Sequence, residues 1–242
     1  MRNRDFYASL LLVVLLLAST PHASAADDPD RDAFERGGQA YARGNYGLAI
    51  EEYRQSLATF GPRYAEAQYN IGVCYYELGK TREAVTWYRA AIKARAGRYP
   101  AASFALGVAL EDLGSREEAK AQFKDAIDTS RGRHTGALFR LGLAFHREGD
   151  FDAAMSHYRR ALAHESGSFP ACHNNLGVLL AINGLVGDAE REFTIALNQS
   201  KGRFEDARLN LELCKFLTIS KSRTYLAKLR TSDGVPVQSQ GQ

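Results

Sequence analysis

Residues 65–99 read AEAQYNIGVCYYELGKTREAVTWYRAAIKARAGRY, and their apolar positions recur with the period of an α-helix. The first half places an apolar face on residues 65–78, at Ile71, Cys74, Tyr75 and Leu78. Gly79 follows directly and predicts a helix end, because glycine adopts the left-handed conformation that terminates many helices. The second half places an apolar stripe on residues 82–94, at Ala84, Val85, Tyr88, Ala91 and Ile92. This stretch therefore predicts two helices joined by a tight turn.

The same pattern recurs every 35 residues through five units, with no insertion. Small residues hold three registers: Gly37, Gly72, Gly107, Gly142 and Gly177; Gly44, Gly79, Gly114, Gly149 and Gly184; and Ala49, Ala84, Ala119, Ala154 and Ala189. Large residues hold two more: Tyr53, Tyr88, Phe123, Tyr158 and Phe193, then Leu57, Ile92, Ile127, Leu162 and Leu197. A glycine inside a helix costs about 1 kcal/mol relative to alanine, so its presence in five units indicates a packing requirement. We expect the small residues to lie where the two helices approach closely, with the aromatic ring filling the wider space beyond them.

This set of residues resembles the tetratricopeptide repeat family. The second unit carries the matching motif as Ile71-Gly72, Tyr75, Gly79, Ala84, Tyr88 and Ala91. The resemblance implies an all-α fold, a right-handed α-solenoid of about five 35-residue helix-turn-helix repeats plus a C-terminal capping helix. It assigns the repeats to residues 30–64, 65–99, 100–134, 135–169 and 170–204, of which the first matches most weakly. The period is one residue longer than the family norm of about 34, and joints such as Gly97-Arg98-Tyr99-Pro100 are unusual.

The N-terminal residues differ from the rest of the chain. A basic start, an apolar run at residues 10–18 and the small-residue site Ala23-Ser24-Ala25 predict a secretory signal peptide over residues 1–25. Cleavage after Ala25 would make the protein periplasmic or secreted. The alternative is an uncleaved N-terminal anchor, although the run is shorter than the roughly 18 residues of a membrane span.

After the fifth repeat, residues 205–230 are expected to form a capping helix and a basic segment. A terminal helix of this kind shields the last apolar face of a solenoid. Within it, residues 215–230 contain five Lys or Arg and no Asp or Glu, and the apolar residues near Leu229 suggest one more short helix. The polar residues 231–242 are expected to be disordered.

Composition and motifs argue against an enzyme and against a nucleic-acid-binding protein. The formal net charge of the 242 residues is only +3. No nucleophile elbow, P-loop, dinucleotide fingerprint or zinc-protease motif appears, so we predict no catalytic residue and no cofactor. His157 and His164 lie two helical turns apart, about 10.5 Å, which is too far for one metal ion, so no metal site is predicted. Cys74, Cys172 and Cys214 are expected to be buried thiols outside any disulfide.

The family resemblance implies a partner-binding groove, because the first helix of each repeat lines the concave surface. The predicted groove residues are Phe34, Tyr69, Asn70, Val73, Tyr76, Phe104, Val108, Phe139, Arg140, Leu143, His146, Asn174 and Asn175. This aromatic and aliphatic stripe, separate from the core set, suits an apolar or aromatic-anchored peptide. Alternatively, the stripe packs against a C-terminal segment of the same chain or is partly covered by neighbouring side chains. Asn70, Asn175 and Asn210 share one register, a partial ladder that would hold the backbone of an extended peptide.

These expectations favour a periplasmic or secreted scaffold or adaptor that binds an unidentified protein or peptide in its groove. The alternative is an accessory subunit of an envelope assembly or secretion complex, with residues 215–230 contacting anionic lipid or an acidic partner. A solvated helix face is the simpler interpretation of that basic segment. No transmembrane segment is expected after signal cleavage, and the sequence does not indicate an oligomeric state.

Overall fold

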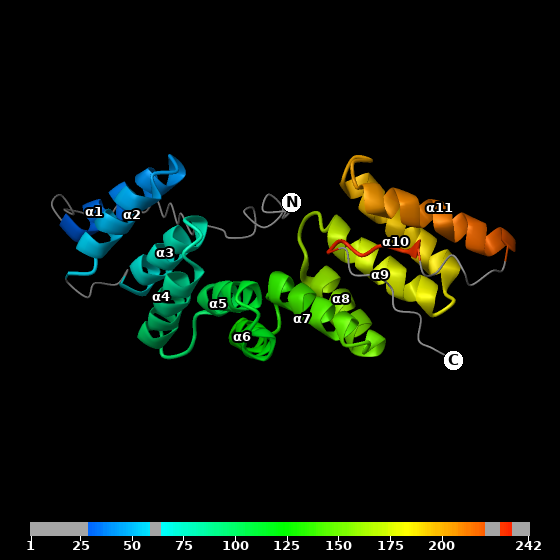
Figure 1. The fold of residues 1–242 in the computed structure, drawn as a ribbon, viewed down its shortest axis with the longest axis horizontal. Helices are drawn as coiled ribbons and strands as arrows, with labels where there is room; N and C mark the ends of the chain where they lie inside the picture. Colours follow the sequence, from blue (N-terminus) through cyan, green and yellow to red (C-terminus); the bar gives the residue numbers. More distant parts are fainter. Residues whose placement is uncertain (1–28, 59–63, 221–227, 234–242) are drawn as a thin grey trace. The chain divides into compact units, whose positions relative to one another are not determined.

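The computed structural model describes residues 29–58, 64–220 and 228–233. The described residues form eleven α-helices and no β-strand, which confirms the predicted all-α repeat fold (Figure 1). They divide into two compact units, Met1–Gly132 and Arg133–Gln242. The first contains α1 (Pro29–Ala42), α2 (Tyr46–Gln55), α3 (Tyr64–Glu77), α4 (Thr81–Ala94), α5 (Pro100–Asp112) and α6 (Arg116–Thr129). The second contains α7 (Thr135–Arg147), α8 (Phe151–His164), α9 (Pro170–Ile182), α10 (Val186–Gln199) and α11 (Glu205–Ser220).

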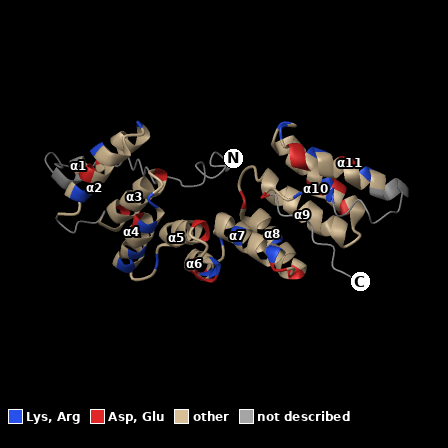
Figure 2. Ribbon diagram, viewed as in Figure 1, with Lys and Arg blue, Asp and Glu red and all other residues tan. Residues whose placement is uncertain are grey.

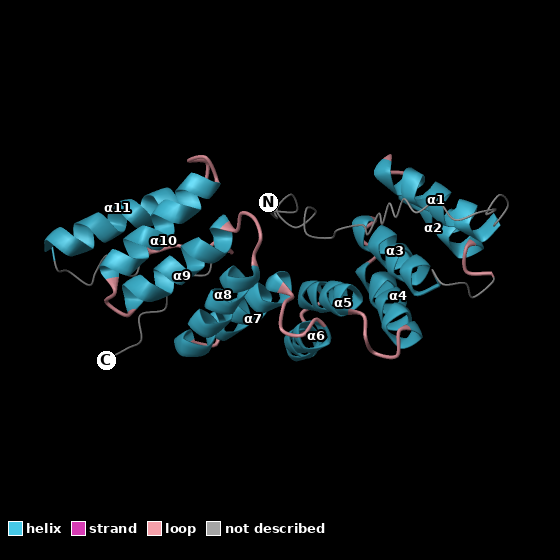
Figure 3. Cartoon of the chain, turned by 180° about the vertical axis from the view of Figure 1, so that it is seen from behind, coloured by secondary structure: helices cyan, strands magenta, loops and turns pink. Residues whose placement is uncertain are grey.

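Helices pack as consecutive antiparallel pairs, which Figure 3 shows from behind. Each pair is joined by a turn that ends in a left-handed glycine. In the second repeat the Gly79 N–H donates to the Tyr76 carbonyl, and the Lys80 N–H donates to the Tyr75 carbonyl, each at 2.9 Å. These two bonds form a Schellman motif, which requires a residue with positive φ after the helix end. Gly79 has a φ of 73°, so the predicted helix-stop role of this register is confirmed.

A second glycine register lies inside the first helix of each pair, where it meets an aromatic ring. A Cβ added at Gly142 would lie 2.5 Å from Tyr158 Cε1, and one added at Gly107 would lie 2.5 Å from Phe123 Cε1. Both rings are fully buried. Only a hydrogen atom fits between helix backbone and ring, which is the packing requirement that the repeated glycines predict.

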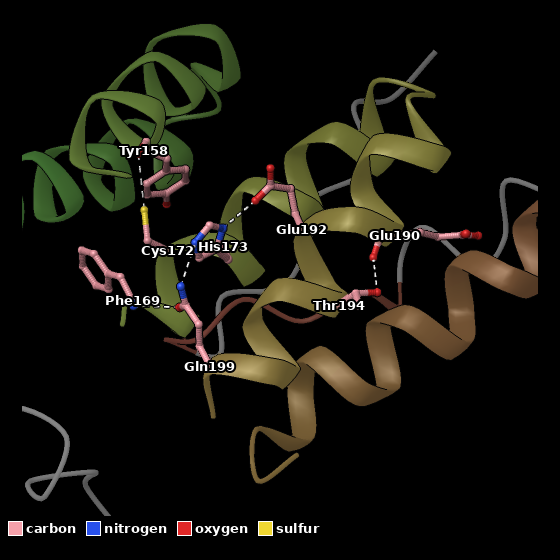
Figure 4. Close-up of polar contacts among 8 residues, drawn as sticks. All are labelled: Tyr158, Phe169, Cys172, His173, Glu190, Glu192, Thr194 and Gln199. Carbon is pink, nitrogen blue, oxygen red and sulfur yellow. Dashed lines mark hydrogen bonds and ion pairs between the residues drawn. The ribbon is translucent and has the colours of Figure 1, made fainter. Parts of the chain in front are cut away.

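The joints between repeats also have a defined geometry. Ala96 and Gly97 adopt φ values of 49° and 78°, so two successive left-handed residues reverse the chain before α5. The joint before α9 is held by side chains instead, as Figure 4 shows. The Phe169 N–H donates to Gln199 Oε1 at 2.8 Å, and Gln199 Nε2 donates to His173 Nε2 at 3.3 Å. His173 Nε2 is thus the acceptor, so its Nδ1 carries the proton that pairs with Glu192 Oε2 at 2.7 Å. This chain of contacts ties the start of α9 to α10.

The ends of the chain extend beyond the repeats. The predicted signal peptide lies outside the described residues, as does most of the expected short helix near Leu229. Residues 228–233 form an irregular segment beside α9 and α11, drawn in red in Figure 1. Cys74, Cys172 and Cys214 are all buried, as predicted. Among the described helices, none combines the length and apolar character needed to cross a membrane.

Candidate functional site

The predicted aromatic stripe belongs to the core instead of an exposed surface. Its four rings each face the large ring of the second helix in the same repeat. The centroid distances are 5.3 Å for Phe34–Tyr53, 5.8 Å for Tyr69–Tyr88, 5.9 Å for Phe104–Phe123 and 5.7 Å for Phe139–Tyr158. Tyr69, Phe104 and Phe139 expose only 3%, 5% and 7% of their surface. The interpretation of this stripe as separate from the core is therefore wrong.

The physical reason is the spacing between two registers of the first helix. Phe139 precedes Gly142 by three residues, so both lie on one helix face and meet the same Tyr158 ring. Residues of the joints cover these aromatics further. Tyr99 lies 5.5 Å from Tyr69 and Phe169 lies 4.9 Å from Phe139, centroid to centroid. Burial accordingly raises the pKa of Tyr69 above its usual range and that of Tyr99 to about 12.

The fifth repeat breaks the aromatic register with Asn174, and a polar site takes its place. Asn174 and Asn175 on α9 and Asn210 on α11 are all fully buried. Asn210 Nδ2 donates to Asn174 Oδ1 at 2.9 Å, which links the two helices. Figure 2 shows α9 without charge, since it carries no Lys, Arg, Asp or Glu. The three amides therefore form a neutral polar cluster, the asparagine site, on an otherwise apolar helix.

The asparagine site holds the backbone of the chain's own C-terminal segment. The Arg230 carbonyl accepts from Asn174 Nδ2 at 2.9 Å and from Asn210 Nδ2 at 2.7 Å. The Arg230 N–H donates back to Asn210 Oδ1 at 2.9 Å, and the Ser232 N–H donates to Asn175 Oδ1 at 2.8 Å. Buried amides require such partners, and an extended backbone supplies them at alternate residues. The alternative that a C-terminal segment of the same chain covers the predicted groove therefore holds here.

This segment differs from the predicted disordered tail. Thr231 is fully buried and Leu229 exposes 2% of its surface, whereas the rest of the tail, residues 234–242, lies outside the described residues. The sequence suggested disorder because residues 231–242 are polar. The polar groups of residues 231–233 instead find partners in the folded protein, which composition does not reveal.

An ion pair fixes the end of the segment. Arg147, the last residue of α7, donates through Nη2 to Asp233 Oδ2 at 2.8 Å, and Thr231 Oγ1 donates to Asp233 Oδ1 at 2.7 Å. The Asp233 side chain is 6% exposed, so this charge-assisted contact is largely shielded from water. Sequence reasoning did not assign this role to Arg147. The sequence offered one clue to this role: the positions of the second and third repeats that correspond to Arg147 carry acidic residues, Glu77 and Asp112.

The other predicted groove residues have different surroundings. Val73, Val108 and Leu143 are buried in the helix packing, Asn70 is buried at 6% exposure, and Arg140 is half-buried. Tyr76 donates its hydroxyl to Asp112 Oδ2 at 2.6 Å within the first unit. Asn174 and Asn175 are thus the predicted residues that meet at one polar site, together with Asn210 and Arg147.

His146 lies beside this site and is 5% exposed. Neither ring nitrogen has a hydrogen-bond partner among the described residues. Burial lowers the pKa of His146, the carboxylate of Asp233 opposes this shift, and the Arg147 guanidinium adds to it. The ring is therefore a buried polar group whose hydrogen-bonding capacity the described residues leave unused.

Chemistry beyond binding has little support from these side chains. Among the described ranges, no three His, Cys, Asp or Glu side chains gather closely enough to hold a metal ion. Burial raises the pKa of the Cys74 and Cys214 thiols to about 12, so both stay protonated and poorly nucleophilic at neutral pH. The site offers amide hydrogen bonds and one cation, which suit the recognition of a peptide backbone.

Comparison with known proteins agrees with the geometry of the helix pairs. The family model described as tetratricopeptide repeat matches residues 34–102 and 104–171. A comparison with curated protein sequences gives no match.

Several solved structures share the fold. PilF of Pseudomonas aeruginosa is 19% identical with a TM-score of 0.66, and the alignment covers 84% of this chain and 89% of that one. A thermophilic tetratricopeptide repeat protein of Thermus thermophilus is 25% identical with a TM-score of 0.53, covering 78% of this chain and 100% of that one. MamA of Desulfovibrio magneticus is 18% identical with a TM-score of 0.59, covering 75% and 100% respectively.

Proposed function

The chain belongs to the tetratricopeptide repeat family, and from this premise we propose that it is a scaffold or adaptor that binds a protein partner through an extended peptide segment. Proteins of this family generally mediate protein–protein interaction and are typically non-enzymatic. The observation that carries the proposal is the set of hydrogen bonds that Asn174 and Asn210 of the asparagine site make with the main-chain atoms of Arg230. Side-chain amides that bind main-chain groups recognise a peptide in extended form, whatever its side chains.

A selection of random displayed peptides on the full chain tests this proposal. We expect selected peptides to bind the wild-type protein and to lose binding to the Asn210→Leu variant, which keeps the branched shape of the side chain but removes the amide oxygen and nitrogen through which Asn210 binds the backbone. Asn198→Ala on the exposed face of α10 is the matched control and should bind as the wild type does. Selected peptides that bind Asn210→Leu and wild type equally would show that the asparagine site is not the partner surface.

We further propose that the protein acts in the periplasm or outside the cell. The support is the basic, apolar and small-residue order of residues 1–25. Alkaline phosphatase is active only after export, so its fusion after residue 45 should be active, and deletion of residues 2–25 should abolish that activity. Equal activity of the two fusions would refute the export signal.

A second candidate function is that of an accessory subunit at an envelope surface. The observation that favours it is the basic stretch at residues 215–230, of which Lys215 is exposed on α11. Salt-sensitive binding to vesicles rich in anionic lipid, lost after charge removal at residues 215–230, would support this candidate. Equal retention on neutral and anionic vesicles would exclude it.

A further inference from the structure

We propose that residues 229–233 are an internal ligand of the asparagine site, and that the site selects partner peptides of the same pattern. That pattern is an apolar residue, any residue, a small hydroxyl residue, any residue and then a carboxylate. The inference rests on the proposed function, because it names the class of peptide that the proposed binding surface takes. It goes beyond that function in assigning a resident competitor within the chain.

The backbone contacts show how the segment is read. Asn210 makes a two-point contact with Arg230, accepting from its N–H and donating to its carbonyl. Asn175 then accepts from the N–H of Ser232, two residues further on. In an extended chain, peptide groups two residues apart point to the same side, so this spacing of contacts matches an extended peptide. The Arg230 side chain itself is exposed, which makes this position tolerant of any residue.

Alternate side chains of the segment are buried and supply the specificity. Leu229 is 2% exposed and Thr231 is fully buried, so the first position takes an apolar residue and the third takes a small one. The Thr231 hydroxyl donates to Asp233, which orients the carboxylate toward Arg147. A larger residue at the third position has no room, and a residue without negative charge at the fifth position loses the ion pair with Arg147.

The internal segment fits the site incompletely. The nearby His146 ring is buried, and neither of its nitrogens has a hydrogen-bond partner in the described part of the chain. Buried polar groups without partners are unfavourable, so a partner peptide that satisfies them binds more strongly, contact for contact, than residues 229–233 do. Weaker binding of this kind is the property required of an internal competitor that a partner peptide displaces.

Binding of a fluorescent peptide to two forms of the full chain tests the proposal. The probe is the nine-residue peptide AKLRTSDGV, which repeats residues 227–235. The emptied variant carries Leu229→Asp and Thr231→Arg, which place a charge and a large side chain in buried positions. An intramolecular ligand acts at an effective concentration on the order of millimolar, so we expect the emptied variant to bind the probe about tenfold more tightly than the wild type, or better.

Matched variants define the result. Arg230→Gln alters an exposed side chain whose backbone carries the contacts, so it should bind the probe as weakly as the wild type. Adding Asn210→Leu to the emptied variant should abolish probe binding. The emptied variant should also fail to bind a probe in which lysine replaces the aspartate. Circular dichroism establishes that the emptied variant is folded. Should it unfold, Ser232→Pro replaces it, because proline removes the N–H that Asn175 accepts.

Equal affinity of the wild type and the emptied variant for the probe would overturn the proposal, and so would tight binding of the lysine-containing probe. If the emptied variant binds peptides from the random selection but not this probe, the partner-binding function stands and the internal-ligand assignment is wrong. If neither form binds any selected peptide, the proposed function fails as well.

Discussion

Replacing Gly142 by alanine should destabilise the protein, although the same change stabilises most helices. The backbone of Gly142 lies in α7, and a Cβ added there would sit 2.5 Å from Tyr158 Cε1 and 2.6 Å from Tyr158 Cδ1. The Tyr158 ring is fully buried, and Phe139 packs beside it at 5.7 Å, so the ring has little room to move. Overpacking a core costs about 1–3 kcal/mol, and a ring confined in this way places the cost near the upper end. The gain in helix propensity is about 1 kcal/mol, which leaves a net loss of about 2 kcal/mol.

Urea unfolding followed by circular dichroism measures this loss as a lower midpoint at unchanged slope. Gly187→Ala is the control, because a Cβ at Gly187 in α10 would meet nothing within 4 Å. It should leave the midpoint unchanged or raise it. In a double-mutant cycle, Gly142→Ala should cost much less when Tyr158→Leu has already removed the ring. A Gly142→Ala protein as stable as the wild type would refute the close helix–ring contact as the reason for the repeated glycines.

Three further predictions follow from buried polar groups. Tyr88→Phe should raise the free energy of unfolding by about 1 kcal/mol in the same assay, because the buried hydroxyl has no hydrogen-bond partner among the described residues; a clear loss would contradict this. Burial lowers the pKa values of His134 and His146 below the usual value of about 6.5. These histidines therefore bind protons more readily in the unfolded chain than in the folded chain, so the free energy of unfolding should fall as the pH drops from 7 through 6.5 towards 5. The fall should be smaller in a variant with both histidines replaced by glutamine. Asn210→Leu should accelerate tryptic cleavage after Arg230, followed by mass spectrometry, because Asn174 and Asn210 hold the Arg230 carbonyl in the wild type; unchanged cleavage would indicate that these bonds do not restrain the segment.

The occupied asparagine site changes how the family resemblance translates into function. An aromatic stripe on the inner face of a repeat array suggests a ready docking surface, but Phe104 and Phe139 already pack against rings of their own repeats. In the C-terminal unit the surface suited to a peptide is polar instead, and it lies where Asn174 departs from the aromatic register. A departure from the repeat was thus a better guide to the candidate site than the repeated feature itself.

The partial asparagine ladder could be predicted from the sequence only in part. Asn175 and Asn210 were predicted to share a register suited to a peptide backbone, and the structure places both on the backbone of residues 230–232. The peptide that they hold was not predictable from the register. It follows α11 in the chain, and its burial depends on contacts with residues some 20 to 86 positions away.

The sequence by itself determined the helices, their turns and the packing inside each pair. These depend on short-range spacing: Gly79 ends a helix through bonds to its own last turn, and Gly142 meets Tyr158 sixteen residues later in the same repeat. Such contacts recur every 35 residues, so the pattern carries their geometry. Only the tertiary structure determined which residues of the inner surface are exposed and which are covered. Whether Phe139 is exposed and whether Asn174 and Arg147 are satisfied depend on which segment lies against them, and a non-repeating contact leaves no periodic trace in the sequence.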